Sequence, residues 1–330
     1  MRICIFGAGA VGSHFAVRLA LAGHEVSCVM RGSHLEAVKA NGLTLRAGDA
    51  EFSAWVNASD EPAALGPQDV VISTLKANGL SSLAAGLRPL LRDDTAVVFA
   101  QNGIPWWYEV GLPSDHPPPP DLSFLDPGGR LRAAVSQARI VGGIIFSSNE
   151  IVAPGLVVND SPERNMLLVG ECDDRQSERI QRLRTALEGA LIQSPPVARI
   201  RETIWTKLIT NMSVSVLCML TAKTARAAVE DPALQDVTSR MLDEAQSIAR
   251  SCYPGATRRS GAAPIHRPSL LQDYERGRPM EIDALVRAPQ AFARSAGLAT
   301  PTLDVFAALA ICRARDKGLY PAARQSLASS

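Results

Sequence analysis

Three polar residues stand four apart in an otherwise apolar stretch, and their types suit chemistry on a polar substrate. The stretch is WTKLITNMSVSVLCMLTA, residues 205–222, and its polar stripe consists of Lys207, Asn211 and Ser215. Apolar residues recur through it at helical spacing, so we expect a mostly buried helix with this stripe on one face. A lysine ammonium is costly to bury without a partner, which suggests that the stripe has a function.

Reduction of a carbonyl is the chemistry that this stripe suits. A carbonyl that accepts a hydride becomes an alkoxide, and an ammonium beside that oxygen stabilises the charge and supplies the proton. We therefore expect Lys207 to be the proton donor and Asn211 to orient the substrate. The structural alternative is a lysine whose ammonium reaches water at the helix end and an asparagine that is bonded in the core.

A second cluster of polar residues lies in HRPSLLQDYERGRPMEIDALV, residues 266–286. Ser269 with Gln272 fits a capping box, and the N–H groups of such a helix start could also bind a substrate carboxylate. Glu281 and Asp283 are two apart and therefore face different ways on a helix, where both would suit the dipole of the first turn. The residues alone leave a structural and a functional interpretation open at each position.

A hydride donor is predicted by the glycine-rich string FGAGAVG at residues 6–12. Its glycines follow G-x-G-x-x-G directly after a strand-like run and open a helical pattern, as the dinucleotide fingerprint requires. They allow a tight turn, let backbone N–H groups approach a pyrophosphate, and bring helix and strand close together. A plain tight turn is the alternative. The cofactor-binding residues expected here are Gly7, Ala8, Gly9, Ala10, Val11 and Gly12.

NADP is favoured over NAD by Arg31, which ends the second strand-like run in VMRGS. A carboxylate at this place would repel a 2′-phosphate, whereas a guanidinium can form charge-assisted bonds with it. Lys76 and Asn102 also follow strand-like runs, in VISTLK and VVFAQNG. Ligands lie across the carboxyl ends of open parallel sheets, so we expect both side chains near the nicotinamide half. The alternatives are a solvated arginine, a surface lysine and a turn asparagine.

The elements that must position these residues change in type along the chain. The first hundred residues alternate the apolar runs RICIF, EVSCVM, DVVISTL and AVVFA with helical patterns, the first of them at residues 11–22. Such strands, separated by helices, predict a parallel sheet covered on both faces. Residues 111–132 are too rich in proline and glycine for a regular element and are expected to form a long surface loop.

Further strand-like segments, ARIVGGIIFSSNEIVAPGLVVND and ERNMLLVG, precede a helix expected at residues 175–191. Beyond residue 200 helical periods dominate. The helices expected there span residues 202–224, 232–251, 269–275, 279–296 and 302–314. We therefore predict an N-terminal α/β domain that binds NADP, residues 1–199, and an all-helical domain with the substrate and catalytic residues, residues 200–330.

The composition of the 330 residues is that of an ordinary globular protein. Hydrophobic residues make up 46%, charged residues 20%, and the net charge is +1, so neither nucleic acid nor an anionic membrane is expected as a partner. The six cysteines lie far apart without a C-x-x-C pair, and the five histidines show no metal-ligand spacing. No uninterrupted apolar run reaches the length of a membrane span, and a strand-like run begins the chain directly, so we expect a cytoplasmic protein without a metal.

Together these segments resemble the ketopantoate reductases (2-dehydropantoate 2-reductases). The residues that carry the resemblance are RICIFGAGAVGSHFAVRLALAGHEV, the Asn-Gly pair after AVVFA, the Lys-x-x-x-Asn pair on the helix and PSLLQDYERGRPMEIDAL. They occur in the family's order and span nearly the whole chain. The resemblance implies a Rossmann-type doubly wound parallel sheet with an all-α C-terminal domain. It also implies an NADP-dependent oxidoreductase of pantothenate biosynthesis that reduces 2-dehydropantoate, or a close analogue, to pantoate.

The resemblance also assigns roles to residues of the helical part. It implies that Lys207 is the catalytic proton donor and that Asn211 and Ser269 bind the substrate. Glu281 matches a glutamate close to the cofactor, where it would help to fix either the cofactor or Lys207 during catalysis.

In the N-terminal part, the resemblance places Asn102 beside the nicotinamide and the substrate, and Arg31 at the 2′-phosphate. Two positions depart from the family's pattern. Ser215-Val216 stands where an Asn-Pro pair is usual, so a shorter donor replaces a substrate contact, and Arg287 stands where many members have glycine. These departures concern the identity of the substrate rather than the proton donor.

The partner expected from all of this is a small-molecule 2-oxo acid, and a homodimer remains open. A related β-hydroxyacid dehydrogenase or an imine reductase is an alternative that shares the two-domain plan. An alternative of another class is a non-catalytic NADP-binding sensor whose helical domain contacts a protein.

Overall fold

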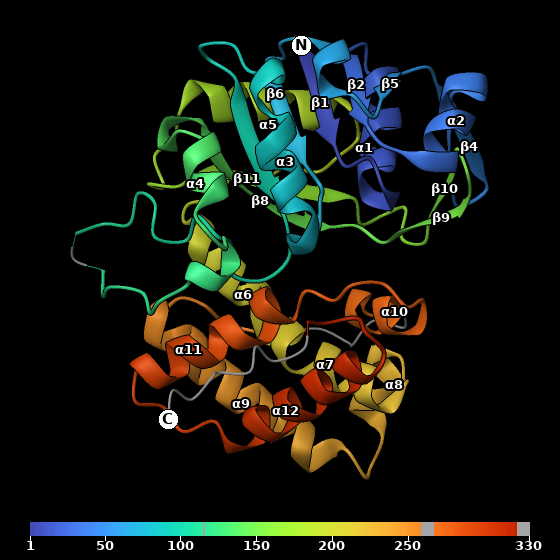
Figure 1. Cartoon of the computed structure of the whole chain (residues 1–330). Helices are drawn as coiled ribbons and strands as arrows, with labels where there is room; N and C mark the ends of the chain where they lie inside the picture. Colours follow the sequence, from blue (N-terminus) through green and yellow to red (C-terminus); the bar gives the residue numbers. More distant parts are fainter. Residues whose placement is uncertain (115, 259–266, 322–330) are drawn as a thin grey trace, which may run out of the picture. The chain divides into compact units, whose positions relative to one another are not determined.

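The chain folds into two compact units (Figure 1). The computed structural model describes residues 1–114, 116–258 and 267–321. The sheet unit comprises Met1–His116 and Ser123–Ile200, and the helical unit comprises Pro117–Leu122 and the chain from Arg201 onward. A short piece of the proline-rich loop thus belongs to the helical unit. Within the remainder of that loop, Ser123–Leu125 forms a 3₁₀ turn and an α-helix begins at Arg130, where no regular element was expected.

A seven-stranded sheet forms the centre of the sheet unit, in the order β11-β8-β7-β6-β1-β2-β5. Its strands are β1 (Arg2–Phe6), β2 (Glu25–Val29), β5 (Asn57–Ser59), β6 (Val70–Ser73), β7 (Ala96–Ala100), β8 (Ile140–Phe146) and β11 (Met166–Glu171). All neighbouring pairs are parallel except β8 with β11. The strand order reverses between β1 and β6, and open sheets bind ligands at the carboxyl ends of the strands beside such a reversal. The expected doubly wound parallel sheet is confirmed.

The central strands are nearly continuous in apolar residues because both faces of the sheet are covered. β6 and β7 are buried at every residue, and β1 at every residue but Arg2. The α-helices of this unit are α1 (Ala10–Leu21), α2 (Gly32–Asn41), α3 (Leu80–Gly86), α4 (Arg130–Ala134) and α5 (Glu178–Gly189). α1 packs on β1 and β2, and α5 packs on β11. Because the strands are buried under these helices, the turns that follow them are held at the carboxyl ends of the sheet.

A second, four-stranded sheet in the order β4-β3-β10-β9 was not expected. Its strands are β3 (Leu43–Ala47), β4 (Ala50–Ala54), β9 (Asn149–Ala153) and β10 (Leu156–Asn159). The predicted break at Pro154-Gly155 is the turn between β9 and β10, but these strands join β3 and β4 rather than the large sheet. α1 contacts β3, β4, β9 and β10, so this sheet packs on the helix that follows the glycine-rich turn.

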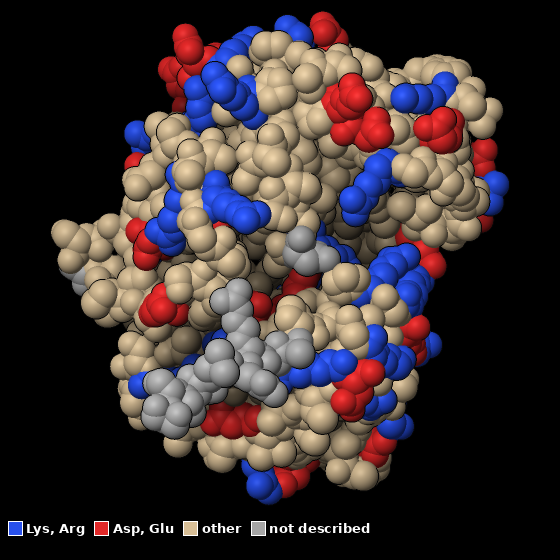
Figure 2. Space-filling view, viewed as in Figure 1, with Lys and Arg blue, Asp and Glu red and all other residues tan. Residues whose placement is uncertain are grey.

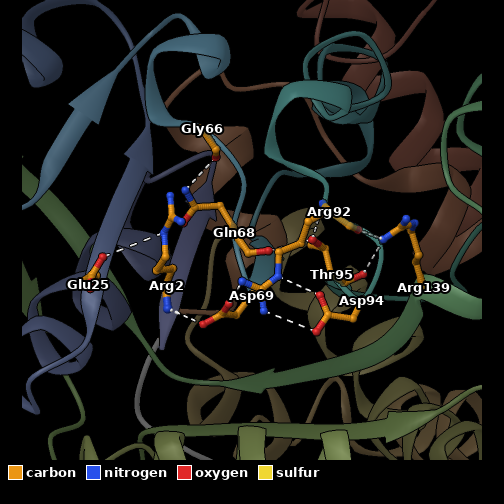
Figure 3. Close-up of polar contacts among 9 residues, drawn as sticks. All are labelled: Arg2, Glu25, Gly66, Gln68, Asp69, Arg92, Asp94, Thr95 and Arg139. Carbon is orange, nitrogen blue, oxygen red and sulfur yellow. Dashed lines mark hydrogen bonds and ion pairs between the residues drawn. The ribbon is translucent and has the colours of Figure 1, made fainter.

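A polar network closes the amino ends of β1, β6 and β7, as Figure 3 shows. Asp69 accepts a hydrogen bond from the backbone N–H of Arg2 at 2.8 Å and pairs with the Arg92 guanidinium at 2.7 Å. Thr95 donates to the carbonyl of Gln68 at 2.7 Å and accepts from the backbone N–H of Arg92 at 2.8 Å. These groups satisfy the backbone at the edge of the sheet opposite to the predicted ligand.

The helical unit is built from helices that begin at α6. They are α6 (Ile200–Met212), α7 (Val214–Thr221), α8 (Ala225–Glu230), α9 (Gln235–Cys252), α10 (Ser269–Glu275), α11 (Ala288–Ser295) and α12 (Pro301–Asp316). A π-helical turn, η6 (Asp283–Arg287), leads into α11. The prediction of an all-α C-terminal part is confirmed for the described residues, and α10 has the bounds that were expected.

α8 was not expected, and two of the expected helices of this unit are interrupted or shortened. The helix expected at 202–224 breaks at Ser213, which is the N-cap of α7. The Ser213 hydroxyl donates to the carbonyl of Ile209 in α6. The helix expected at 279–296 begins only after Glu281, with a π-turn. Apolar periodicity continues through both places, so neither irregularity is visible in the pattern of residues.

One stretch, Ile200–Thr221, is long and apolar enough to cross a membrane by length and composition alone. Its mean hydropathy is 1.3, and 67% of the apolar window is buried inside the structure. Lys207 interrupts the apolar run, and Trp205 and Leu208 beside it are at most 1% exposed. This burial is typical of a core helix in a globular protein.

Candidate active site

Gly7 shapes the turn between β1 and α1. Its φ is +87°, in the left-handed region, and a Cβ there would lie 2.3 Å from Cδ2 of Leu75. The N–H groups of Gly7 and Ala8 both donate to the carbonyl of Val29 at 3.0 Å, which ties the turn to the end of β2. Only glycine combines this backbone conformation with so close a neighbour.

Gly12 and Gly9 differ in what the fold requires of them. A Cβ on Gly12 would lie 2.5 Å from Oγ1 of Thr74 and 2.8 Å from Cγ2 of Ile5, so this glycine lets α1 approach β1. A Cβ on Gly9 would meet no atom of the described chain closer than 3.8 Å. The fold itself therefore does not need glycine at position 9, and close approach of a ligand is the reason that the fingerprint supplies.

The turn delivers unpaired N–H groups to the start of α1. Ser13 makes the first intrahelical bond, to the carbonyl of Gly9 at 2.8 Å, so the N–H groups of Ala10, Val11 and Gly12 have no partner within the helix. No acidic residue lies in the first turn. The positive end of the helix dipole and these three donors together form a site for a phosphate group.

Two hydroxyl groups hold the carbonyls of the turn. Thr74 Oγ1 donates to the carbonyl of Gly7 at 2.8 Å, and Ser13 Oγ donates to the carbonyl of Ala8 at 3.0 Å. Both carbonyls are thus engaged inside the protein. Neither Thr74 nor Ser13 was predicted from the sequence, although the position of Thr74 directly after a strand could have indicated it.

Arg31 lies beyond β2 at the N-cap of α2, with an exposed side chain and an extended backbone. Among the described residues no carboxylate pairs with its guanidinium, which leaves the group available to an anion. Because β2 is parallel to β1, Arg31 and the glycine-rich turn lie at the same edge of the sheet. The chain's residues thus fit NADP at the diphosphate and at the 2′-phosphate.

Lys76 and Asn102 follow β6 and β7 at this same edge. β6 pairs with β1 and with β7, all in parallel, so the three carboxyl ends are neighbours. Both side chains are half-buried. Gly103 has a φ of +80° and turns the chain directly after Asn102. The sheet unit therefore brings together every cofactor-binding residue predicted for it.

In the helical unit, Lys207 and Asn211 lie one turn apart on α6, and both are half-buried. The two residues share a face of the helix, as expected from their spacing. Ser215 is 6% exposed and lies on α7, beyond the break at Ser213, so it does not continue this face as part of one helix. The stripe of three is thus a pair on α6 and a third residue on a separate helix.

Ser269 is the exposed first residue of α10, and the capping box expected there is wrong. The N-cap is Pro268, whose carbonyl accepts the N–H of Gln272 at 3.0 Å, and the Gln272 side chain donates to the carbonyl of Arg267 at 3.0 Å. The hydroxyl of Ser269 is therefore not used as the cap.

The two acids of the second cluster have different surroundings. Asp283 accepts hydrogen bonds from Arg287 at 2.8 Å and from the Tyr320 hydroxyl, so its role is structural. These contacts also explain why an arginine stands at position 287. Its guanidinium bonds both Asp283 and the Tyr320 hydroxyl and so ties the π-turn to the end of the described chain. Glu281 is 5% exposed and precedes that turn, so a buried carboxylate stands where the family's glutamate was expected.

Comparison with known proteins decides the family. The model of ketopantoate reductase PanE/ApbA matches residues 3–107, and the model of the ketopantoate reductase PanE/ApbA C terminal matches residues 199–312. The chain is 41% identical to a 2-dehydropantoate 2-reductase from Mesorhizobium japonicum, over 97% of this chain and 100% of the relative. The chain belongs to the ketopantoate reductase family.

Solved structures agree with this family. A protein from Ralstonia solanacearum MolK2, assigned as a ketopantoate reductase, has a TM-score of 0.85 and 34% identity, over 97% of this chain and 99% of that one. A 2-dehydropantoate 2-reductase from Geobacter metallireducens GS-15 has a TM-score of 0.78 and 25% identity, over 94% of this chain and 99% of that one.

The fold extends beyond ketopantoate reductases. D-mandelate dehydrogenase, solved with NADH and anilino(oxo)acetate, has a TM-score of 0.76 at 19% identity, over 96% of this chain and 99% of that one. Its structure holds NADH, so the fold alone does not decide between the two nicotinamide cofactors. For this ketopantoate reductase family member, the sequence predicts that Arg31 favours NADP.

Proposed function

We propose that this family member reduces 2-dehydropantoate to pantoate with NADPH as the electron donor. The observation that carries the proposal is the pair of half-buried polar residues on α6, where Lys207 and Asn211 share one helix face. A proton donor beside an amide suits a substrate whose carbonyl oxygen becomes an alkoxide. We assign NADP binding to residues 1–199 and substrate binding and catalysis to residues 200–330.

The cofactor contacts in this proposal come from the sheet unit. The N–H groups at the start of α1 would bind the diphosphate and Arg31 the 2′-phosphate, while Lys76 and Asn102 would lie at the nicotinamide half. Bound NADPH supplies a hydride. The protein's own contribution is to hold the cofactor at a fixed place, which lowers the entropic cost of the transfer.

The proton in this proposal comes from Lys207. The carbonyl carbon gains a hydride, the carbonyl oxygen gains the proton of the Lys207 ammonium, and the neutral amine then takes a proton back from water. Asn211 and Ser269 would hold the hydroxyl and carboxylate ends of the substrate, with Ser215 and Asn102 as further contacts. Glu281, which is 5% exposed, would fix the lysine or the cofactor.

The activity is tested by following NADPH absorbance with a panel of 2-oxo acids. We expect turnover with 2-dehydropantoate or a close analogue in which a smaller contact suffices, because Ser215 replaces the asparagine usual in the family. Turnover only of β-hydroxyacids with NADP⁺, or only of imines with NADPH, would favour the related dehydrogenases and reductases. Tight NADPH binding without turnover of any compound would favour a sensor.

The choice of cofactor is tested by Arg31→Ala. Each charge-assisted bond to the 2′-phosphate is worth roughly 1.5–3 kcal/mol, so we expect NADPH binding to weaken about tenfold to a hundredfold while NADH binding stays the same. Arg46→Ala is the matched control, because this exposed arginine lies on β3 of the small sheet and pairs with Glu51 at 2.7 Å. Equal losses for both cofactors would remove Arg31 from the 2′-phosphate.

We also propose a cytoplasmic homodimer without nucleic acid or membrane partners. On the face seen in Figure 2, acidic and basic side chains are interspersed over each unit, which suits a protein in free solution. Val305 and Leu309, one turn apart on α12, are 58% and 49% exposed and would suit burial against a second copy. Light scattering of the protein and of its Leu309→Glu variant measures the oligomeric state.

A further inference from the structure

His34 on α2 joins three separate parts of the sheet unit. Its Nδ1 lies 3.0 Å from the backbone nitrogen of Gly155, in the turn between β9 and β10, and its Nε2 lies 3.1 Å from Oγ of Ser13 on α1. Ser13 Oγ in turn lies 3.0 Å from the carbonyl oxygen of Ala8, in the glycine-rich turn. The three hydrogen bonds form one chain from the small sheet to the start of α1.

The hydrogens in this chain have one consistent arrangement. The Gly155 N–H can only donate, so His34 Nδ1 is an acceptor and a neutral ring carries its hydrogen on Nε2. The Ala8 carbonyl can only accept, so Ser13 donates to it and must accept from His34. Both ends of the chain thus require the same tautomer. Burial lowers the pKa of His34, which favours this neutral ring.

This series of hydrogen bonds matters for the anion site because it turns the Ala8 carbonyl inward. A carbonyl oxygen that faced the diphosphate would repel it, whereas one that is bonded inward leaves the N–H groups to face the anion. Thr74 does this for Gly7 directly. Ser13 holds the Ala8 carbonyl in the same way. Because Ser13 is 0% exposed, its hydroxyl oxygen would be buried without a hydrogen-bond donor if His34 were removed.

His34 also lies one helical turn from Arg31. Arg31 is the N-cap of α2, and His34 follows in its first turn. The bond to Gly155 anchors this turn to the small sheet, where a Cβ on Gly155 would lie 3.3 Å from Cβ of Ala37 on α2. One imidazole thereby contacts the group that shapes the diphosphate site and fixes the turn that carries the candidate 2′-phosphate ligand.

We propose that His34 is a positioning residue of the cofactor site, which aligns the glycine-rich turn through Ser13 and the start of α2 through Gly155. The inference rests on the proposed function, since it needs NADP at this edge of the sheet. It assigns His34 no contact with the cofactor. Its effect passes through the Ser13 hydroxyl, and this allows the two nitrogens of the ring to be tested apart.

Two amide variants separate the two contacts of the ring. His34→Gln places an N–H donor near the position of Nε2 and can bond Ser13, whereas His34→Asn places an acceptor near the position of Nδ1 and can bond only Gly155. His34→Ala and Ser13→Ala remove the link to Ala8 altogether. His24→Gln is the matched control, because His24 directly precedes β2 at the opposite, amino edge of the sheet.

The dissociation constants of NADPH and NADH are measured by fluorescence titration of the full chain, with thermal unfolding of each variant alongside. We expect His34→Ala and Ser13→Ala each to weaken NADPH about tenfold, the loss of one hydrogen bond, and the double variant to weaken it no further. His34→Gln should restore binding to within about threefold, His34→Asn should not, and His24→Gln should match the wild type.

Each other outcome decides the matter in a different way. Equal NADPH binding by His34→Ala and the wild type would overturn the inference while leaving the proposed function intact. Equal recovery or equal loss in the Gln and Asn variants would also overturn it, since the role would then not pass through Ser13. If His34→Ala does not fold, the Gln and Asn pair still decides. A wild-type chain that binds no NADPH overturns the proposed function instead.

Discussion

At the scale of single residues, the assignment of Lys207 as proton donor makes a direct prediction. Lys207→Ala should lower kcat by at least about a hundredfold, the lower figure for a positioned acid, while NADPH binding persists. Steady-state kinetics with the best 2-oxo acid and NADPH titration measure the two effects separately. Lys223→Ala is the control, because this lysine is 41% exposed and pairs with Asp231 at 3.0 Å. Full kcat in the Lys207 variant would end this assignment.

His14 on α1 gives a prediction about pH. Its ring is 0% exposed, its Nδ1 lies 2.6 Å from Oδ1 of Asn149, and burial lowers its pKa to about 4. Below about pH 6.5 the His14 ring of the unfolded chain is protonated, whereas the ring of the folded protein stays neutral. The stability that this histidine contributes is therefore complete above pH 6.5 and decreases as the pH falls toward 4, by about 3 kcal/mol in total.

Two measurements check this. Proton NMR should show that the His14 ring of the folded protein stays neutral down to about pH 4, and denaturant titration should show a steeper loss of stability below pH 6.5 in the wild type than in His14→Gln. Carboxylates titrate in both proteins, so the difference between the two curves isolates the histidine. A ring that titrates near pH 6.5 in the folded protein would contradict the prediction.

The residues that the sequence predicted well are those whose role depends on spacing. The fingerprint glycines were placed correctly because their pattern reports a backbone geometry, which the φ of Gly7 and the neighbours of Gly12 then display. Thr74, Ser13 and His34 were missed, because a hydroxyl or an imidazole that bonds a carbonyl elsewhere in the chain has no local signature. The roles of the proposed catalytic residues stay predictions.

At the scale of elements, burial decides what a sequence shows. The strands of the large sheet were recognised because they are apolar throughout. β4 has no fully buried residue and β3 alternates, so neither stood out, and their partners β9 and β10 follow more than ninety residues later along the chain. The break at Ser213 was missed since serine and β-branched residues lower helix propensity only slightly, and tertiary contacts decide whether a helix continues.

A helix cap from a distant element gives a prediction at this scale. Glu244 on α9 accepts the N–H groups of Thr302 and Leu303, in the first turn of α12, at 3.0 and 2.8 Å. Its carboxylate therefore acts as the cap of a helix that begins more than fifty residues later. Glu244→Ala should lower the free energy of unfolding by about 1–2 kcal/mol, as measured by denaturant titration.

The neighbouring acid provides the control for this cap. Asp243 is exposed on the same helix, and its side chain makes no hydrogen bond to α12 among the described residues, so Asp243→Ala should leave the stability within about 0.5 kcal/mol of the wild type. Similar losses in both variants would show that charge on α9, rather than the cap, is what stabilises α12.

At the scale of the whole molecule, the sheet unit has one edge that the protein closes and one that it leaves to a ligand. Asp69, Arg92 and Thr95 pair the backbone and side chains at the amino ends of the strands. At the carboxyl ends the first N–H groups of α1 have no intrahelical partner, and Gly9 leaves open space beside them. Binding at that edge should therefore stabilise the folded chain without any rearrangement of its core.

Calorimetry with two glycine variants tests this. NADPH at about a hundred times its dissociation constant should stabilise the wild type by about 2.7 kcal/mol and raise Tm on the order of 4 °C. Gly9→Ala should keep the Tm of the free protein, because its Cβ meets nothing within 3.8 Å, yet lose most of the NADPH shift. Gly12→Ala should lower the Tm of the free protein, because its Cβ would lie 2.5 Å from Thr74. A full NADPH shift in Gly9→Ala would mean that the diphosphate does not approach this turn, and the open space beside Gly9 would then need another explanation.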